Sequence, residues 1–122
     1  MIDFTNGSII KLKKTDSAPA DINPLLIQGE VIVSAYKGIR DYVVFTNKRV
    51  IAVNVQGMTG KKKDYTSLPY AKVQAFSVET SGVFDMDSEL ELYFSALGLV
   101  KFEFTGASDI VRIGQIISTY IL

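Results

Sequence analysis

The stretch EVIVSAYKGIRDYVVFTNKRVIAVNV, residues 30–55, contains three short runs rich in β-branched and aromatic residues, separated by residues that favour turns. Such runs are typical of strands, so the stretch predicts strands over 30–36, 40–46 and 49–55. Only Asn47 and Lys48 separate the second run from the third. They predict a two-residue hairpin loop, since asparagine tolerates the positive φ that such a turn requires.

Four further runs follow the first three, and the C-terminal segment then changes its period. The additional candidate strands span 64–70, 72–79, 88–94 and 99–105. Pro69 indicates a strand end or an edge in the first of these. Seven short strands within about 75 residues predict a sandwich or a barrel.

An amphipathic helix is predicted over the last fifteen residues, 108–122, because isoleucine and tyrosine recur there at spacings of three and four. Ser108 is placed to cap its first turn. The simplest place for the apolar stripe is over an open end of the β structure, as a lid. A free helix that binds a partner is the alternative.

The N-terminal residues are harder to interpret, and we divide the chain into an arm over 1–28 and a domain over 29–122. Asn23, Pro24 and Gly29 indicate one helical turn, with a cap, a proline at its first position and a glycine at its exit. For residues 1–20 two alternatives stay open. They form either a helix built on Ile9, Ile10 and Leu12 that ends in a loop through residues 18–20, or an arm that orders only on a neighbour.

Length and composition exclude several classes of function. The chain has 122 residues, 48% of them hydrophobic, which fits one domain with its own core. It has no cysteine and no histidine, which excludes disulfides, thiolate chemistry and the usual general base near neutral pH. No stretch approaches the ~18 apolar residues of a membrane span, and the first residues lack a secretory pattern, so a cytoplasmic protein is expected.

The 13 basic and 13 acidic residues are unevenly distributed along the chain. Residues 37–75 contain eight basic and two acidic residues, a net charge of +6. Residues 76–104 contain six acidic residues and one lysine, a net charge of −5. Nucleic-acid binding is not favoured, because the pI is near 6.2 and the aromatic residues lie mainly in strand runs.

The basic block includes QGMTGKKKDY, residues 56–65, which joins two predicted strands. It lacks the spacing and the following helix of a P-loop. In a meander the loops after the first and third strands lie at the same end of the sheet, which predicts an end that attracts anions or an anionic membrane. A solvated loop tip is the simpler interpretation. The candidate anion-binding residues are Lys37, Arg40, Lys61, Lys62 and Lys63.

The acidic block includes FDMDSELEL, residues 84–92, whose acidic residues alternate with other residue types. On a strand these carboxylates share one face, which fits a solvated surface, a protein interface or a metal site. Residues two apart on a strand are about 6 to 7 Å apart and do not converge on one ion, so no metal or cofactor is predicted. No catalytic residue is predicted either. The predicted interface joins this run to the lysine loop of a neighbour and consists of Met58, Lys61, Lys62, Phe84, Asp85, Asp87, Glu89 and Glu91.

Three segments resemble the bacterial pleckstrin-homology-like family, and they occur in the family's order: GEVIVSAYKGIRDYVVFTNKRVI, GMTGKKKDYTSLPY and VETSGVFDMDSELEL. The resemblance extends from Leu25 to Tyr93. It implies two orthogonal antiparallel sheets of seven strands closed by a C-terminal α-helix. It also implies a binding or assembly module without catalysis, of the kind that forms ring-like homo-oligomers. A self-assembling scaffold or protein-docking module is therefore expected, with peripheral binding of anionic lipid as the alternative.

Overall fold

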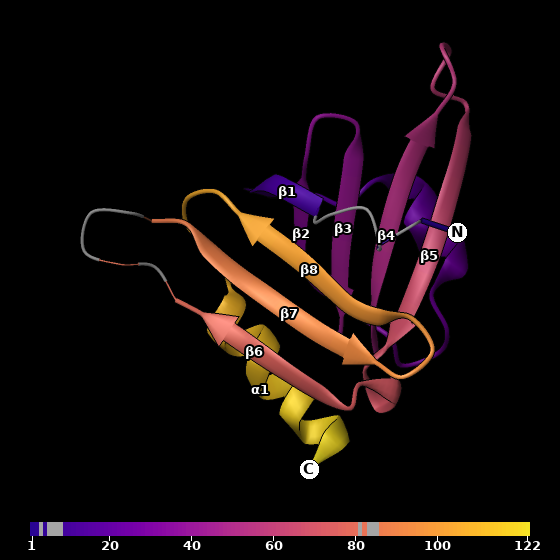
Figure 1. The fold of residues 1–122 in the computed structure, drawn as a ribbon. Helices are drawn as coiled ribbons and strands as arrows, with labels where there is room; N and C mark the ends of the chain where they lie inside the picture. The colour runs from indigo at the N-terminus through magenta and orange to yellow at the C-terminus, as the bar shows by residue number, and fades with distance from the viewer. Residues whose placement is uncertain (3, 5–8, 81, 83–85) are drawn as a thin grey trace.

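The computed structural model describes residues 1–122 except residues 3, 5–8, 81 and 83–85. The described residues form one eight-stranded sheet in the order β5-β4-β3-β2-β1-β8-β7-β6, followed by helix α1 (Figure 1). The strands are β1 (Ile9–Thr15), β2 (Ile32–Lys37), β3 (Asp41–Thr46), β4 (Arg49–Gln56), β5 (Lys62–Pro69), β6 (Ala75–Glu79), β7 (Ser88–Phe94) and β8 (Gly98–Phe104). The helices are the short 3-10 helices η1 (Ala20–Leu25) and η2 (Tyr70–Lys72) and the α-helix α1 (Ile110–Ile121). All seven predicted strands are present.

The sheet folds over on itself instead of forming two separate sheets. Strands β2 to β5 make one antiparallel meander and strands β6 to β8 make another. Strand β1 joins the two, because it pairs antiparallel with β2 and parallel with β8. Figure 1 shows β6, β7 and β8 crossing β2 to β5 at a steep angle. The two expected sheets are therefore two layers of one continuous sheet.

Strand β1 stands where the sequence predicted a helix or an unpaired arm. Leu12 is fully buried and pairs with Phe104 of β8. Lys11 has a φ of +57° at a register shift between Ile9 and Leu12, so the strand is irregular at this point. A short apolar run does not distinguish a strand from a helix by periodicity alone, which explains the wrong prediction.

The predicted helical turn starting at Asn23 is not confirmed, because η1 already begins at Ala20 and contains Pro24. Its Ile22 is fully buried against the outer face of β2 to β5, where it packs with Ala35, Val44 and Ile51. Strand β1 is thus part of the sheet, and η1 packs on its surface. The boundary after residue 28 stays a prediction.

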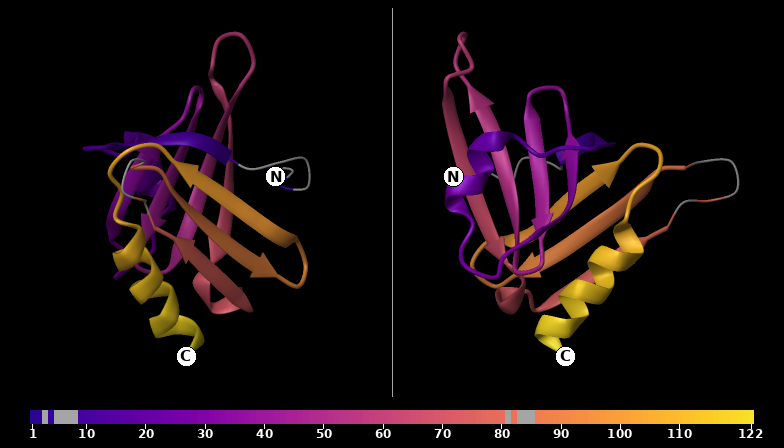
Figure 2. Two further views of the ribbon diagram at one scale, coloured as in Figure 1. Left: turned by 60° about the vertical axis from the view of Figure 1, so that its left-hand side comes forward. Right: turned by 180° about the vertical axis from the view of Figure 1, so that it is seen from behind.

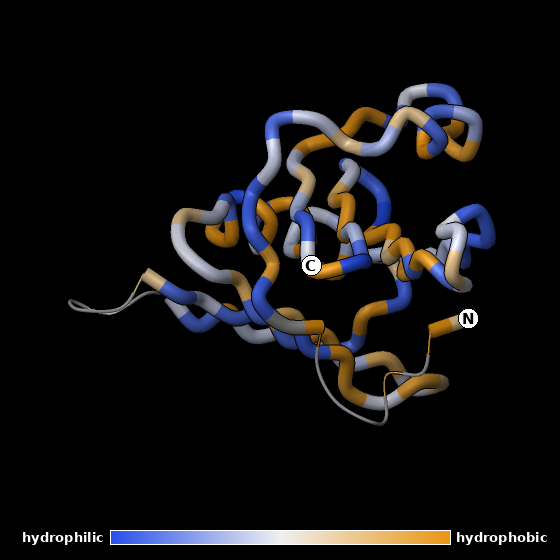
Figure 3. The backbone as a smooth tube through the Cα atoms, turned by 90° about the horizontal axis from the view of Figure 1, so that it is seen from above, coloured by the Kyte–Doolittle hydropathy of each residue, from blue (hydrophilic) through white to orange (hydrophobic). Residues whose placement is uncertain are grey.

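The main core lies between the two layers and α1. Four aromatic rings from both layers meet there, with ring centroids 4.7 Å apart for Tyr36 and Phe104 and 6.0 Å apart for Phe45 and Phe102. Hydrophobic and hydrophilic residues are interspersed along the chain (Figure 3). Buried and less buried positions alternate along β7 and β8, whereas β3 and β4 each have a run of successive buried residues, because η1 packs on their other face. The packing of these rings fixes how the two layers cross.

Helix α1 covers the open side of the core, as predicted (Figure 2, right). Ile110, Ile113 and Ile117 are buried in the same cluster as the aromatic rings. Ser108 does not cap the helix, because its hydroxyl lies 2.9 Å from that of Ser88. The N-cap residue is Asp109, whose side chain makes no capping hydrogen bond.

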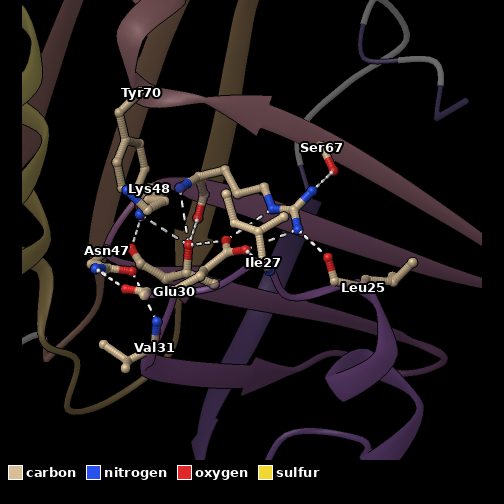
Figure 4. A network of polar contacts seen from close by, with 11 residues as sticks. Leu25, Ile27, Glu30, Val31, Asn47, Lys48, Ser67 and Tyr70 are labelled. Carbon is tan, nitrogen blue, oxygen red and sulfur yellow. Dashed lines mark hydrogen bonds and ion pairs between the residues drawn. The ribbon is translucent and has the colours of Figure 1, made fainter.

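The hairpin between β3 and β4 has the predicted two-residue loop, but Asn47 has a different role from the one expected. Lys11 is the one residue besides glycine with a positive φ in the described part of the chain, so Asn47 does not supply one. The Thr46 hydroxyl instead accepts hydrogen bonds from the N–H groups of Lys48 and Arg49, both at 3.0 Å. The Asn47 side chain reaches the segment before β2, accepting from the Val31 N–H at 2.9 Å and donating to the Gly29 carbonyl at 3.1 Å (Figure 4).

A buried ion pair joins this hairpin to the same segment. The Glu30 side chain has no exposed surface, and Arg49 donates to both its oxygens, at 2.9 Å and 3.0 Å (Figure 4). The Arg49 guanidinium also donates to the Leu25 carbonyl at 2.6 Å and to the Ser67 hydroxyl at 3.0 Å. Burial by itself raises the pKa of Glu30, but hydrogen bonds from Arg49 and Thr46 outweigh it, so this pKa lies below its usual value. Thr46, Asn47 and Arg49 thus all have structural roles at this hairpin.

Candidate functional site

The loops between β2 and β3 and between β4 and β5 lie at the same end of the sheet, as predicted (Figure 1). The Arg40 guanidinium donates to the Gly57 carbonyl at 2.6 Å, so the two loops are in direct contact. Lys37 lies with its Nζ 5.6 Å from the centroid of the Tyr42 ring. Arg40 and Lys37, both candidate anion-binding residues, thus have partners within the chain.

The three successive lysines point in different directions. Side chains alternate along β5, so Lys62 and Lys63 lie on opposite faces. Lys63 forms an ion pair with Asp21 at 2.5 Å, and the hydrogen bond from Lys63 lowers the pKa of Asp21. Lys61 and Lys62 are exposed and have no ion-pair partner among the residues that the structure describes. Lys62 and Lys63 therefore do not converge on one anion, and the role of the five candidate residues in binding stays a prediction.

The same end of the sheet also carries exposed apolar side chains. Ile39, in the β2–β3 loop, is 90% exposed, and Met58, in the β4–β5 loop, is fully exposed. We call Ile39, Met58, Lys61 and Lys62 the loop end. It combines two exposed apolar groups with two cations.

The predicted acidic surface lies on the outer face of β6, β7 and β8. Glu89 and Glu91 of β7 point away from the core, because the leucines between and after them are buried. The strand register places Glu89 between Glu79 of β6 and Glu103 of β8, and it places Glu91 opposite Lys101. The Lys101 ammonium lies 3.3 Å from the Glu89 carboxylate and 3.8 Å from that of Glu103, and the hydrogen bond to Glu89 raises the pKa of Lys101.

An exposed apolar pair lies beside these carboxylates on the same face. Tyr93 of β7 and Leu99 of β8 are directly opposite each other and are 46% and 50% exposed. We call Tyr93, Leu99, Glu89, Glu91 and Lys101 the outer face. The acidic side of the predicted interface came from residues 84–91 alone and lacked the residues of β6 and β8. The period of two along 98–104 was the signal that could have placed Leu99, Lys101 and Glu103 together.

Asp87 lies just before β7, where its carboxylate accepts from the Gly106 N–H at 3.1 Å. Together with Glu79, Glu89, Glu103 and Lys11 it lines a polar hollow of about 280 Å³. Within the described ranges, no group of three or more acidic side chains is arranged to hold a metal ion. Phe84 and Asp85, which were also predicted at the interface, lie outside the described residues.

Known proteins match nearly the whole chain. A family model described as "Bacterial PH domain" matches residues 2–121. The chain belongs to the bacterial PH domain family. The predicted resemblance is therefore confirmed.

Two relatives of this bacterial PH domain occur in Bacillus subtilis (strain 168). The uncharacterized protein YjqA is 45% identical over 85 residues, which cover 70% of this chain and 68% of YjqA. The uncharacterized protein YozO is 32% identical over 100 residues, which cover 82% of this chain and 86% of YozO.

Two crystal structures share the fold. A DUF1696 family protein with a pleckstrin-homology domain from Shewanella loihica PV-4 is 38% identical, with a TM-score of 0.74, and the match covers 93% of this chain and 99% of that one. A pleckstrin homology domain from Shewanella amazonensis SB2B is 43% identical, with a TM-score of 0.60 and 84% of each chain covered. Across the described ranges of this PH domain, we find no helix with the length and apolar character to cross a membrane.

Proposed function

We propose that this bacterial PH domain is a non-catalytic, self-assembling scaffold in which the loop end of one copy contacts the outer face of the next. The observation that carries the proposal is the outer face, where exposed Tyr93 and Leu99 lie beside Glu89 and Glu91. Aromatic residues are enriched in protein interfaces relative to other surfaces. The apolar pair can form the centre of such an interface, and the carboxylates beside it can form its charged border.

The loop end has the complementary chemistry. Its Met58 and Ile39 can cover the apolar pair, and its Lys61 and Lys62 can face Glu89 and Glu91. Burial of apolar surface contributes about 25 cal/mol per Å², whereas an exposed ion pair contributes about 0 to 1 kcal/mol. The apolar groups should therefore provide most of the affinity, and the charges should set orientation and association rate.

The two surfaces differ, so their contact is heterologous and generates a ring where the rotation closes. A cyclic homo-oligomer is consequently the assembly that we propose. The same outer face could bind a different protein in place of another copy. The scaffold and the protein-docking module would then use the same surface and differ only in the partner.

Charge reversal tests the contact. We expect the Glu89→Lys, Glu91→Lys double variant to shift the sedimentation profile toward monomer, because its lysines would face Lys61 and Lys62 of the neighbour. Adding Lys61→Glu and Lys62→Glu should restore part of the assembly. Lys72→Glu is the matched control, since Lys72 is exposed in η2 away from the loop end.

Thermal melts of each variant separate a loss of assembly from a loss of folding. Full assembly of the Glu89→Lys, Glu91→Lys protein would show that the outer face is only solvated. A monomeric parent at all concentrations would remove the scaffold proposal altogether.

Peripheral binding to an anionic membrane is the second candidate, and the exposed Met58 between two glycines next to three lysines favours it. Each basic residue near an anionic surface contributes about 1 kcal/mol. The carboxylates of the outer face oppose this attraction in many orientations. We therefore expect weak or no flotation of the parent with vesicles that contain phosphatidylserine.

The Lys61→Glu, Lys62→Glu variant completes this test, and we expect its stability to change by less than about 0.5 kcal/mol per exposed substitution. Strong flotation of the parent that disappears in this variant, and not in Lys72→Glu, would make lipid binding the primary function.

A further inference from the structure

The two edge strands of the sheet differ in how they are protected. The β5 edge carries charged residues and a proline, which discourage pairing with another strand. The N-terminal residues also lie beside it: the Met1 ammonium is 2.7 Å from the Asp64 carboxylate, and the Ile2 N–H donates to the Thr66 hydroxyl at 3.1 Å. Strand β6, with the sequence AFSVE, has no lysine and no proline. In the described part of the chain it pairs with β7 alone.

An apolar groove of about 520 Å³ runs beside this edge, between β6 and α1. Phe76 and Val78 form the wall on β6, and Val111 and Gly114 form the wall on α1. Gly114 keeps the two walls close, because a Cβ at this position would lie 3.3 Å from Val78 Cγ2. Val111 is 60% exposed at the rim. All side chains that line the groove are uncharged.

A strand added to β6 would place its side chains in two different environments, since successive side chains point to opposite faces. Those on the inner face would enter the apolar groove. Those on the side away from the core would lie next to Ser77 and Glu79, and Glu79 is itself directly opposite Glu89. Like charges directly opposite each other are destabilising. A cation on the added strand would be attracted to these carboxylates and would also reduce the repulsion between them.

We propose that β6 and this groove bind an extended peptide segment of a partner protein, in which apolar residues alternate with lysine or arginine. The backbone pairs with the β6 edge, apolar side chains fill the groove and basic side chains face Glu79. A second copy of the chain is not the proposed occupant. Short segments of this protein that alternate in this way, Lys11–Lys13 and Val100–Phe102, belong to β1 and β8, and each of these strands is already paired on both sides. The proposed assembly contact also uses the outer face and not the edge.

The test uses a fluorescein-labelled peptide that alternates lysine and valine and is long enough to pair with all of β6. We expect saturable binding by fluorescence anisotropy, weakened about tenfold or more by Val111→Asp and by Glu79→Lys. Val31→Asp is the matched control, because Val31 is a valine of nearly the same exposure as Val111, 59% against 60%, and lies just before β2, outside the groove and the proposed assembly contact. Its affinity should equal that of the parent.

Two further peptides test the chemistry: one with glutamate in place of lysine, and one N-methylated at the amides that would pair with β6. Both should bind at least about tenfold more weakly than the lysine peptide. Absence of saturable binding, or equal binding of either control peptide, would overturn the proposal. So would a parent that self-associates and becomes monomeric in Val111→Asp without peptide, because the groove would then hold a second copy.

Discussion

Replacing Arg49 with methionine is expected to lower the free energy of unfolding by about 3 to 5 kcal/mol at neutral pH, the range for removing one partner of a buried ion pair. The Glu30 carboxylate has no exposed surface and would lose both bonds from the guanidinium. Methionine keeps most of the apolar stem of arginine, so the loss reports mainly on the charge. Urea denaturation of the parent and the variant measures it.

The pH dependence of this loss identifies its cause. In the parent, the folded pKa of Glu30 lies below the unfolded value of about 4.5, so its contribution to stability is complete above pH 4.5 and is lost as the pH falls through the folded pKa. Without Arg49, burial should raise the pKa of Glu30 above the unfolded value. The folded variant then takes up a proton as the pH falls, and its deficit relative to the parent should shrink toward pH 4.5.

The double variant Glu30→Gln, Arg49→Met is the control, because it has no buried charge. Its deficit should be smaller than that of Arg49→Met alone and nearly constant with pH. A loss below about 1 kcal/mol for Arg49→Met, as is usual for exposed ion pairs, would contradict the assigned role of this network.

The parts of the fold that were predicted correctly are those set by neighbours along the chain. The strands β2 to β4 follow from runs of β-branched residues and a two-residue loop. Strand β1 was missed because its pairing is set by β8, whose Phe104 is far from Leu12 in the sequence. Lys11, Lys13 and Lys14 also dilute its apolar pattern. The joining of two layers into one sheet depends on that distant pairing and was therefore not predicted.

The candidate surfaces show the same limit. The charges of the loop end and of β7 could be read from the sequence, and the structure places them on two separate surfaces. Their partners could not be read, because Lys63 is neutralised by Asp21 from η1, and Asn47 is held by Gly29 and Val31. The exposed Tyr93 and Leu99 become neighbours only through the register of β7 with β8. Spacing along one strand carries no information about such a pair.

The second large effect is expected in α1, where Ile113→Ala should lower the free energy of unfolding by about 2 to 5 kcal/mol as a large-to-small change in the core. Ile113 is fully buried among the residues that join α1 to both layers. A helix as short as Ile110–Ile121 is marginal on its own in water, so its stability depends on this packing.

Val111→Ala on the same helix is the matched control. Val111 is 60% exposed, so this variant should stay within about 0.5 kcal/mol of the parent. If both variants melt at the same temperature, α1 does not close the core.

The loss of stability in Ile113→Ala should also affect peptide binding. Helix α1 forms one wall of the groove beside β6, whereas the outer face lies on the opposite side of that layer. Near the melting point, Ile113→Ala should therefore lose affinity for the lysine–valine peptide before it loses the ability to assemble.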